Sequence, residues 1–220
     1  MIIERLSLGS FQANCYIFGP EASGEAVIID PGDEPQTILQ AARDLKLTPR
    51  LIIATHGHID HILAAQALCE ATGAPFAMHQ ADRPLLEGLP DIARRWLGVA
   101  ATPPTVDRWL EAGDSIGIDG LQLRVLYTPG HSWGSISLYW TPPPGEAGIV
   151  FSGDALFAGG IGRTDLGGDF PTLARSIREQ LFTLPADTVV LSGHGGPTTI
   201  GRERRTNPWV GEQAHPFQEP

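Results

Sequence analysis

The sequence has little cysteine and no long hydrophobic run. Its two cysteines, Cys15 and Cys69, are too few for a disulfide framework, although a single bridge remains open at this point. No apolar run approaches the ~20 residues that a membrane-spanning helix needs. The N-terminus, MIIERLSLG, lacks a basic segment followed by a long apolar one, so we expect no signal peptide. Together these absences predict a cytoplasmic protein that does not associate with membranes.

Positive charge is also scarce. The chain carries 15 Lys and Arg against 25 Asp and Glu, for a net charge of -10. Proteins that bind nucleic acid cluster Lys and Arg against the phosphates, so we expect no nucleic-acid partner. With 220 residues, 42% of them hydrophobic, the chain can bury the core of one domain. A monomer and a small homo-oligomer both remain open.

Short apolar runs rich in β-branched residues alternate with helical patterns. The runs that predict strands are residues 2–8, 14–19, 26–30, 51–55, 121–127, 135–140, 148–153 and 188–193. Apolar residues at helical spacing predict helices over 35–46, 60–72 and 171–182. Strand–helix–strand units fill the first half, and strands dominate the middle. This order predicts an α/β (α+β) fold in which helices cover layered sheets.

Residues 80–112 differ from their surroundings. They hold a short amphipathic stretch, a Pro pair, Trp96 and Trp109. We expect a helical insertion and a loop here, within a domain of residues 1–209 that is followed by an irregular tail over 210–220. The two tryptophans either overhang a binding pocket or pack in the core, and core packing is the interpretation we favour.

Three histidines and an aspartate crowd the segment ATHGHIDH at residues 54–61. Side chains two apart in an extended segment point the same way, so His56 and His58 can grip one cation from one side. Asp60 and His61 follow at the expected start of a helix, where the turn aims them elsewhere. The segment therefore predicts ligands for two cations, which lie about 3.5–4 Å apart in two-metal sites.

Further ligand types follow other strands. His131, Asp154 and His194 each lie next to a glycine after an apolar run, and strand ends are where α/β folds place sites. Imidazole and carboxylate together suit two divalent ions, zinc first, with iron or manganese as alternatives. Asp30, in AVIIDPG, either forms a turn or accepts a hydrogen bond from a ligand imidazole, outside the ligands themselves.

These motifs resemble the metallo-β-lactamase superfamily, in which HxHxDH is followed by separate His, Asp and His ligands. The similarity covers about residues 1–209. FQANCY, TPGHSWGS, GDALFAGGIGRTDL and GHGGPTTIGRERRTNPW further resemble the glyoxalase II-like hydrolases of the short, single-domain (YcbL-like) type. The resemblance implies a four-layer αβ/βα sandwich with the metals at one edge of the two sheets.

The resemblance also implies how the ligands divide. His56, His58 and His131 would hold one metal, Asp60, His61 and His194 the other, and Asp154 would bridge both. One departure matters: longer glyoxalase II enzymes bind glutathione with a C-terminal helical domain. Only the 26 residues from 195 to 220 follow His194 here, so recognition of glutathione does not carry over.

The expected chemistry is hydrolysis. Two metals lower the pKa of bound water, so that hydroxide exists near neutral pH, and they polarise a carbonyl group. Asp60 can orient the hydroxide and take up its proton while remaining a ligand. A thiolate leaves without a strong general acid. We therefore expect a hydrolase of small hydroxyacyl thioesters such as S-lactoylglutathione.

Other readings remain open. Persulfide dioxygenases share the GRTD stretch and bind one iron through two His and an Asp, here His56, His131 and Asp154. A lactonase and a β-lactamase are further hydrolases of the superfamily. In a non-catalytic reading, the metals would only hold the fold together.

A few charged or titratable residues have two interpretations each. Arg163, in GGIGRTD, either binds an anionic substrate group or pairs with Asp165. The arginines of RERR at 202–205 either contact substrate or form a solvated helix face, which we favour. His79 ends another strand but the ligand set is complete without it, and His215 lies in the tail. We expect neither histidine in the site.

Overall fold

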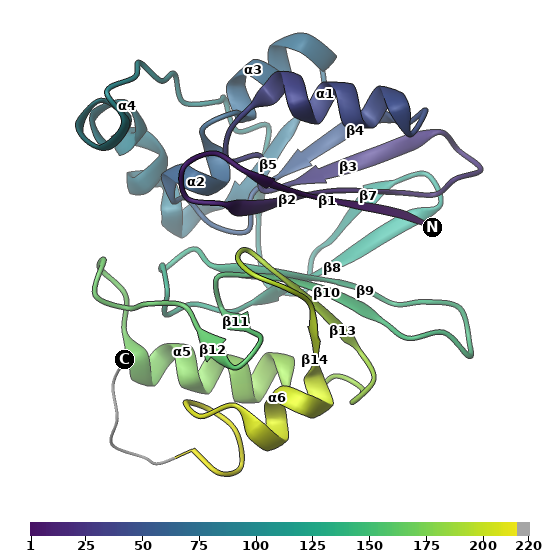
Figure 1. Ribbon diagram of the computed structural model, residues 1–220, viewed down its shortest axis with the longest axis vertical. Helices are drawn as coiled ribbons and strands as arrows, with labels where there is room; N and C mark the ends of the chain where they lie inside the picture. The colour runs from purple at the N-terminus through teal and green to yellow at the C-terminus, as the bar shows by residue number, and fades with distance from the viewer. Residues whose placement is uncertain (215–220) are drawn as a thin grey trace.

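The computed structural model describes residues 1–214, and two six-stranded sheets face each other at its centre (Figure 1). The strands of the first sheet are, in spatial order, β1 (Ile2–Leu8), β2 (Ala13–Gly19), β3 (Glu25–Ile29), β4 (Thr48–Ile53), β5 (Phe76–His79) and β6 (Arg108–Leu110). The strands of the second are β14 (Thr198–Thr199), β13 (Val189–Ser192), β10 (Ile149–Gly153), β9 (Ile136–Trp140), β8 (Leu121–Tyr127) and β7 (Ser115–Ile118).

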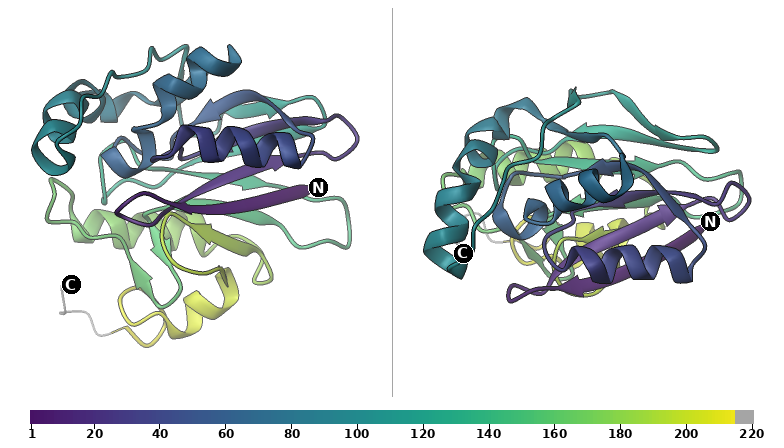
Figure 2. Two further views of the ribbon diagram at one scale, coloured as in Figure 1. Left: turned by 45° about the horizontal axis from the view of Figure 1, so that its top comes forward. Right: turned by 90° about the horizontal axis from the view of Figure 1, so that it is seen from above.

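Helices cover the outer face of each sheet (Figures 1 and 2). The first sheet carries α1 (Pro35–Asp44), α2 (Ile59–Ile62) and α3 (Ala65–Thr72), and α4 (Arg83–Leu97) lies against α2 at the end of the molecule. The second carries α5 (Phe170–Ser176), which continues as a π-helical turn (Ile177–Leu181), and α6 (Ile200–Thr206); a small hairpin joins β11 (Leu156–Phe157) and β12 (Gly160–Ile161). The predicted four-layer α/β sandwich is confirmed. Within residues 1–214, no helix combines the length and apolar character needed to cross a bilayer.

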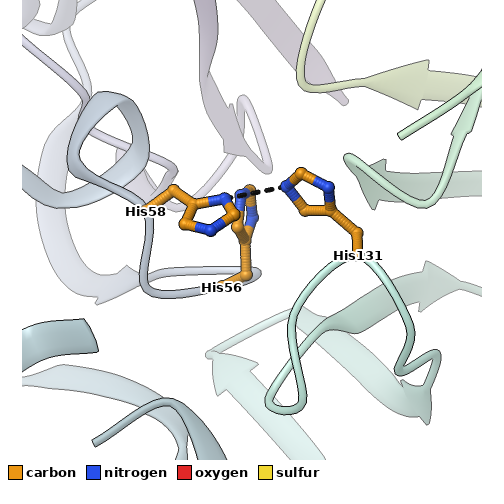
Figure 3. Close-up of side chains that lie close together, drawn as sticks. All are labelled: His56, His58 and His131. Atoms are coloured by element: carbon orange, nitrogen blue, oxygen red, sulfur yellow. Dashed lines mark hydrogen bonds between the residues drawn. The ribbon is translucent and has the colours of Figure 1, made fainter. Parts of the chain in front are cut away.

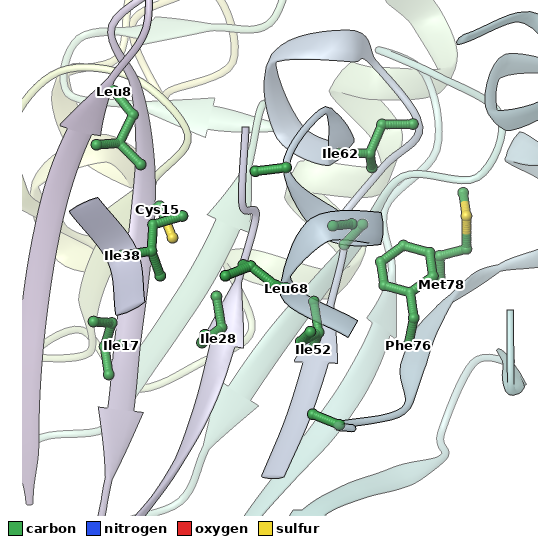
Figure 4. Packing of buried hydrophobic residues seen from close by; sticks show 14 of the residues in the cluster. Leu8, Cys15, Ile17, Ile28, Ile38, Ile52, Ile62, Leu68, Phe76 and Met78 are labelled. Atoms are coloured by element: carbon green, nitrogen blue, oxygen red, sulfur yellow. The ribbon is translucent and has the colours of Figure 1, made fainter. Parts of the chain in front are cut away.

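Apolar side chains fill all three spaces between the four layers. On β4, Ile52 packs under the helices of the first sheet, and its neighbour Ile53 packs between the two sheets. Ile28 and Ile29 of β3 divide in the same way, and Figure 4 shows Ile28 and Ile52 in the outer cluster. Because both faces of these strands are buried, they appear in the sequence as continuous apolar runs.

All eight predicted strands are present, with ends shifted by up to three residues. The segment predicted as a helical insertion and a loop contains α4, but its end is a strand, β6, which pairs in parallel with β5. A strand of three residues is too short to show a periodic pattern in the sequence, so β6 was not predicted. Asp107 holds this strand in place, because its carboxylate accepts a hydrogen bond from the Phe76 amide at 2.8 Å. Residues 211–213 form a turn, and His215 lies outside the described residues.

The helix predicted over 60–72 is interrupted between α2 and α3. There the amide of Ala64 donates to the carbonyl of Pro31 at 3.0 Å, instead of bonding within a continuous helix. The turn after β3 therefore lies against α2. Gly32 permits this approach, because a Cβ at that position would overlap the carbonyl oxygen of Asp60.

The two sheets meet closely at one edge. β3 and β4 run parallel in the first sheet, as β10 and β13 do in the second. Two loops that leave these carboxyl ends are bonded to the opposite sheet: Gly193 O, after β13, accepts from the Asn14 amide of β2 at 2.7 Å, and Thr55 O, after β4, accepts from the Ile136 amide of β9 at 2.9 Å. This edge brings together side chains that lie far apart in the sequence.

Candidate metal centre

Three imidazoles converge at this edge from two loops (Figure 3). His56 and His58 lie in the loop after β4, and His131 lies in the loop after β8. One ring nitrogen from each lies within 4.8 Å of the other two. His58 Nδ1 and His131 Nε2 are 2.8 Å apart. We call these three residues the first triad.

A second group lies beside the first. Asp60 and His61 belong to α2, and His194 follows β13. Their ligand atoms also lie within 4.8 Å of one another. Asp60 Oδ2 is 3.2 Å from His194 Nε2 and 3.7 Å from His61 Nε2. We call these residues the second triad; they are the three that the family resemblance groups together.

Asp154 lies between the two triads. Its Oδ1 is 3.5 Å from His61 Nε2. Its Oδ2 is 3.6 Å from His131 Nε2 and 3.5 Å from His194 Nε2. Gly193 leaves room for this arrangement, because a Cβ there would overlap Asp154 Oδ1. All seven predicted ligands are therefore gathered in one cluster, with Asp154 in the shared position.

The donor atoms of the cluster fit bound cations. His56 Nε2, His61 Nε2 and Asp154 Oδ1 are buried and have no hydrogen-bond partner within residues 1–214. A buried polar atom without a partner costs about 1–3 kcal/mol, which a metal ligand bond would remove. Burial, followed by the neighbouring imidazoles, lowers the pKa of His56, and it lowers the pKa of His58 to about 3. Both rings are thus neutral, the form that binds metals.

The second triad gathers negative charge. Burial opposes protonation of His61, but Asp154 and Asp30 outweigh it and raise the pKa of His61 to about 10. The hydrogen bond to Asp60 raises the pKa of His194. Burial alone would raise the pKa of Asp60, yet His194 and His61 hold it below its usual range. The carboxylates thus favour positive charge at this position, and a cation can supply it in place of protons.

Thr55 and Asp30 lie behind the imidazoles of the cluster. Asp30 accepts hydrogen bonds from the amide and the hydroxyl of Thr55 at 2.6 and 2.7 Å. The Thr55 hydroxyl is 3.1 Å from His56 Nδ1. Asp30 Oδ2 also lies 3.1 Å from His61 Nδ1, although without hydrogen-bond alignment. Asp30 therefore lies behind the ligands, as predicted, and its aligned hydrogen bonds reach Thr55 rather than an imidazole.

Asp82 is a residue of this site that the sequence interpretation missed. It is 1% exposed. Its carboxylate accepts hydrogen bonds from the Gly57 amide at 2.8 Å, the Ser132 hydroxyl at 2.6 Å and the Gly134 amide at 2.6 Å. Gly57 separates the first two histidines of the first triad, and Ser132 follows His131. Asp82 thus joins the two loops that carry the first triad.

Replacing Asp82 with asparagine should weaken the first triad as a metal site. One carboxylate oxygen becomes an NH₂ group, which cannot accept a hydrogen bond from the N–H or O–H group that it faces. One of the two loops therefore loses its hydrogen bond to residue 82. Loss of a residue that orients metal ligands typically lowers metal affinity by about 10–100-fold. Competition with a chromophoric chelator for Zn²⁺ measures this. Asp107→Asn is the matched control, since Asp107 also accepts a backbone amide but far from the cluster. Equal zinc affinity in both variants would contradict the role of Asp82.

A cavity of about 810 Å³ opens onto the cluster. His58, Asp60, His131, Asp154 and His194 line its floor. Trp96 lines its wall and is 48% exposed, so the favoured core interpretation is wrong for this residue. Trp109 packs against the core of the first sheet, as predicted.

Arg163 forms the predicted ion pair with Asp165, and its contact with an anionic substrate group stays a prediction. The residue lines the cavity, and its guanidinium donates two hydrogen bonds to Asp165 at 2.6 Å each. Its carbonyl also lies 2.7 Å from His131 Nδ1, which leaves Nε2 of that ring facing the cluster. The RERR arginines lie on α6 outside the cavity lining, with Arg202 and Arg205 exposed. His79 stacks on Tyr127, with ring centroids 4.6 Å apart, and joins neither triad.

The chain is similar to known proteins both in sequence and in structure. The family model described as metallo-beta-lactamase superfamily matches residues 8–194. The hydroxyacylglutathione hydrolase GloC of Haemophilus influenzae is 37% identical over 97% of this chain and 100% of its own. The B3 metallo-beta-lactamase BLEG-1 has a TM-score of 0.86 and 38% identity, over 95% of this chain and 99% of its own. TTHA1623, solved in a di-iron-bound form, has a TM-score of 0.80 and 40% identity, over 94% of this chain and 100% of its own.

The matched region includes every member of the two triads as well as Asp154 and Asp82. The fold, the ligand cluster and the matched family model agree with one another. The chain therefore belongs to the metallo-beta-lactamase superfamily, and within it to the glyoxalase II-like, single-domain type.

Proposed function

We propose that the protein hydrolyses small acyl thioesters with the help of two divalent metal ions. The observation that carries this proposal is the convergence of the two triads and Asp154 at the floor of an open cavity, where ligand atoms of His56, His61 and Asp154 lack hydrogen-bond partners. Similarity to a hydroxyacylglutathione hydrolase supports a thioester as the substrate. Zinc remains our first choice of metal, and the di-iron form of TTHA1623 supports iron as the alternative.

The proposed ligand sets follow the geometry. His56, His58 and His131 would hold one metal, Asp60, His61 and His194 the other, and Asp154 would contact both. When bound, such metals activate water and polarise the carbonyl of the substrate. Asp60 lines the cavity, and its Oδ2 is held 3.2 Å from His194 Nε2. It is therefore placed to orient the attacking water and accept its proton.

Access to solvent supports catalysis over a purely structural site. The side chain of His194 is 31% exposed and that of Asp60 is 18% exposed, both toward the cavity. Structural metal sites are closed by their protein ligands, whereas catalytic sites keep a position open. The thiolate released from a thioester is a good leaving group. Hydrolysis therefore needs no strong general acid, and we propose none.

A second candidate is β-lactam hydrolysis, which the similarity to BLEG-1 favours. Persulfide oxidation is the other test case, because His56, His131 and Asp154 offer the two-histidine, one-carboxylate set of mononuclear iron oxygenases. These reactions differ in their metal requirement and in their use of oxygen.

The proposal is tested by measuring metal content and three activities on one preparation. We expect two metal ions per chain and hydrolysis of S-lactoylglutathione or another acyl thioester. Oxygen uptake with glutathione persulfide, one iron per chain and no thioester hydrolysis would replace our proposal with the oxygenase. Turnover of β-lactams alone would replace it with the lactamase.

We also propose that the protein acts in the cytoplasm on a small molecule and not on nucleic acid. Both cysteines are free thiols, with Cys15 buried and Cys69 partly buried, which fits a reducing compartment. The net charge of -10 supports the absence of a nucleic-acid partner.

A further inference from the structure

We infer that the preferred substrate carries an apolar acyl chain, which lies along α4 while its carbonyl reaches the metal cluster. This inference rests on the proposed thioesterase function and names the substrate class. It depends on the composition of the cavity walls, which the ligand cluster itself does not determine.

One face of α4 forms an apolar wall of the cavity. Leu85, Leu89, Ile92 and Trp96 all line it. They are spaced four, three and four residues apart, so they lie in one stripe along the helix. Leu89 is buried, Leu85 and Ile92 are half-buried, and Trp96 is exposed. The apolar face of α4 therefore extends from the buried Leu89 to the exposed Trp96.

This stripe leads from the cluster to the mouth of the cavity. Asp82, just before α4, holds the loops of the first triad, and Leu85 lies against Gly57 within one of those loops. From Leu85 to Trp96 a helix extends about 16 Å. Figures 1 and 2 show α4 at the end of the molecule away from the N-terminus. A chain that starts at the cluster can thus follow α4 outward.

Apolar residues also form the opposite side and the mouth. Phe157, Ile161 and Leu166 line the cavity from the β11–β12 hairpin and the segment after it. The rings of Phe11 and Trp96 lie 6.2 Å apart at the opening. Of the seven exposed large hydrophobic residues within 1–214, three surround this opening: Phe11, Trp96 and Leu166. Exposed apolar patches of this kind mark sites for apolar ligands.

The walls offer little to a small, polar acyl group or to a highly charged one. Apart from the histidines of the floor, Arg163 is the one basic side chain that lines the cavity among the described residues, and Asp165 already pairs with it. A lactoyl group has three carbons and a hydroxyl, and it would leave most of the ~810 Å³ unfilled. An acyl chain of medium length fills more of the cavity and contacts the α4 stripe.

The test measures kcat/KM for a series of acyl thioesters of one small uncharged thiol, N-acetylcysteamine. The acyl groups are acetyl, butyryl, hexanoyl and octanoyl. Each methylene that becomes fully buried multiplies kcat/KM by about three to four. Because the chain is only partly enclosed, we expect an increase of about tenfold or more between acetyl and octanoyl. Thioethers of the same chain lengths, which cannot be hydrolysed, should bind in the same order in a calorimetric titration.

Trp96→Ala should reduce the octanoyl-to-acetyl ratio of kcat/KM by about three- to tenfold, because it removes a large part of the apolar wall. Trp133→Ala is the matched control: Trp133 is 50% exposed and lies outside the cavity lining. Hydrolysis of all thioesters at equal rates, or a ratio that both variants change equally, would overturn the inference and leave the thioesterase proposal intact. If no thioester is hydrolysed while thioethers still bind in order of length, the thioesterase proposal fails and apolar binding stands.

Discussion

Replacing His58 with alanine should remove metal from the first triad and abolish most of the hydrolytic activity. One ring nitrogen of His58 lies within 4.8 Å of a nitrogen of His56 and of His131, and His58 Nδ1 is only 2.8 Å from His131 Nε2. Only His56, His131 and the shared carboxylate of Asp154 would remain, so the first site loses one of its three imidazoles and should bind its ion much more weakly. Because metal binding lowers the pKa of water from about 16 to about 7, we expect kcat to fall by about three orders of magnitude.

The metal content and the rate of thioester hydrolysis are measured on the same sample of the purified variant. His79→Ala is the matched control, since His79 ends a strand and is partly buried, but stacks on Tyr127 outside the cluster. We expect this control to retain both metals and its activity. A His58→Ala protein that is folded by circular dichroism and turns over thioester at the original rate would refute our assignment of the first triad.

The ligand cluster was predictable because its residues carry a local signal. HxHxDH is dense enough to stand out, and the other ligands each follow an apolar run that forms a strand. Parallel strands such as β10 and β13 bring their carboxyl ends to one edge, so strand-end residues meet even when they are distant in sequence. The division into two triads came from the family resemblance, and the distances agree with it.

Asp82 could not be predicted in the same way. Its partners, Gly57, Ser132 and Gly134, lie 25 to 52 residues away along the chain. Two of the three donors are backbone amides, which every residue except proline possesses and which leave no trace in a sequence. An aspartate before a helix is ordinarily explained by capping alone.

The role of Trp96 was missed for a related reason. An amphipathic pattern shows that α4 has an apolar face, but it does not show where that face ends against the sheet. The stripe from Leu85 to Trp96 extends beyond the core to the cavity, and this depends on the position of the β11–β12 hairpin opposite. The interruption between α2 and α3 likewise depends on a distant group, the carbonyl of Pro31.

Replacing Asp154 with asparagine should weaken both metal sites at once, whereas His194→Ala should weaken only the second. Asp154 is the residue whose two oxygens reach both triads, at 3.5 Å from His61, 3.6 Å from His131 and 3.5 Å from His194. A carboxylate between two dications offsets their mutual repulsion, and an uncharged amide of the same shape does not. We therefore expect Asp154→Asn to bind fewer than one metal ion per chain at a concentration that saturates the unaltered protein.

Metal titrations of the two variants, measured by isothermal calorimetry, distinguish a ligand shared by both sites from a ligand of one site. His194→Ala should keep one ion per chain, because the first triad is intact. Asp114→Asn removes the same charge from a partly exposed residue outside the cluster, and it should bind two ions. If Asp154→Asn and His194→Ala lose the same single ion, Asp154 belongs to the second site alone. The pair of metals would then have no shared carboxylate, and each triad would have to hold its cation independently.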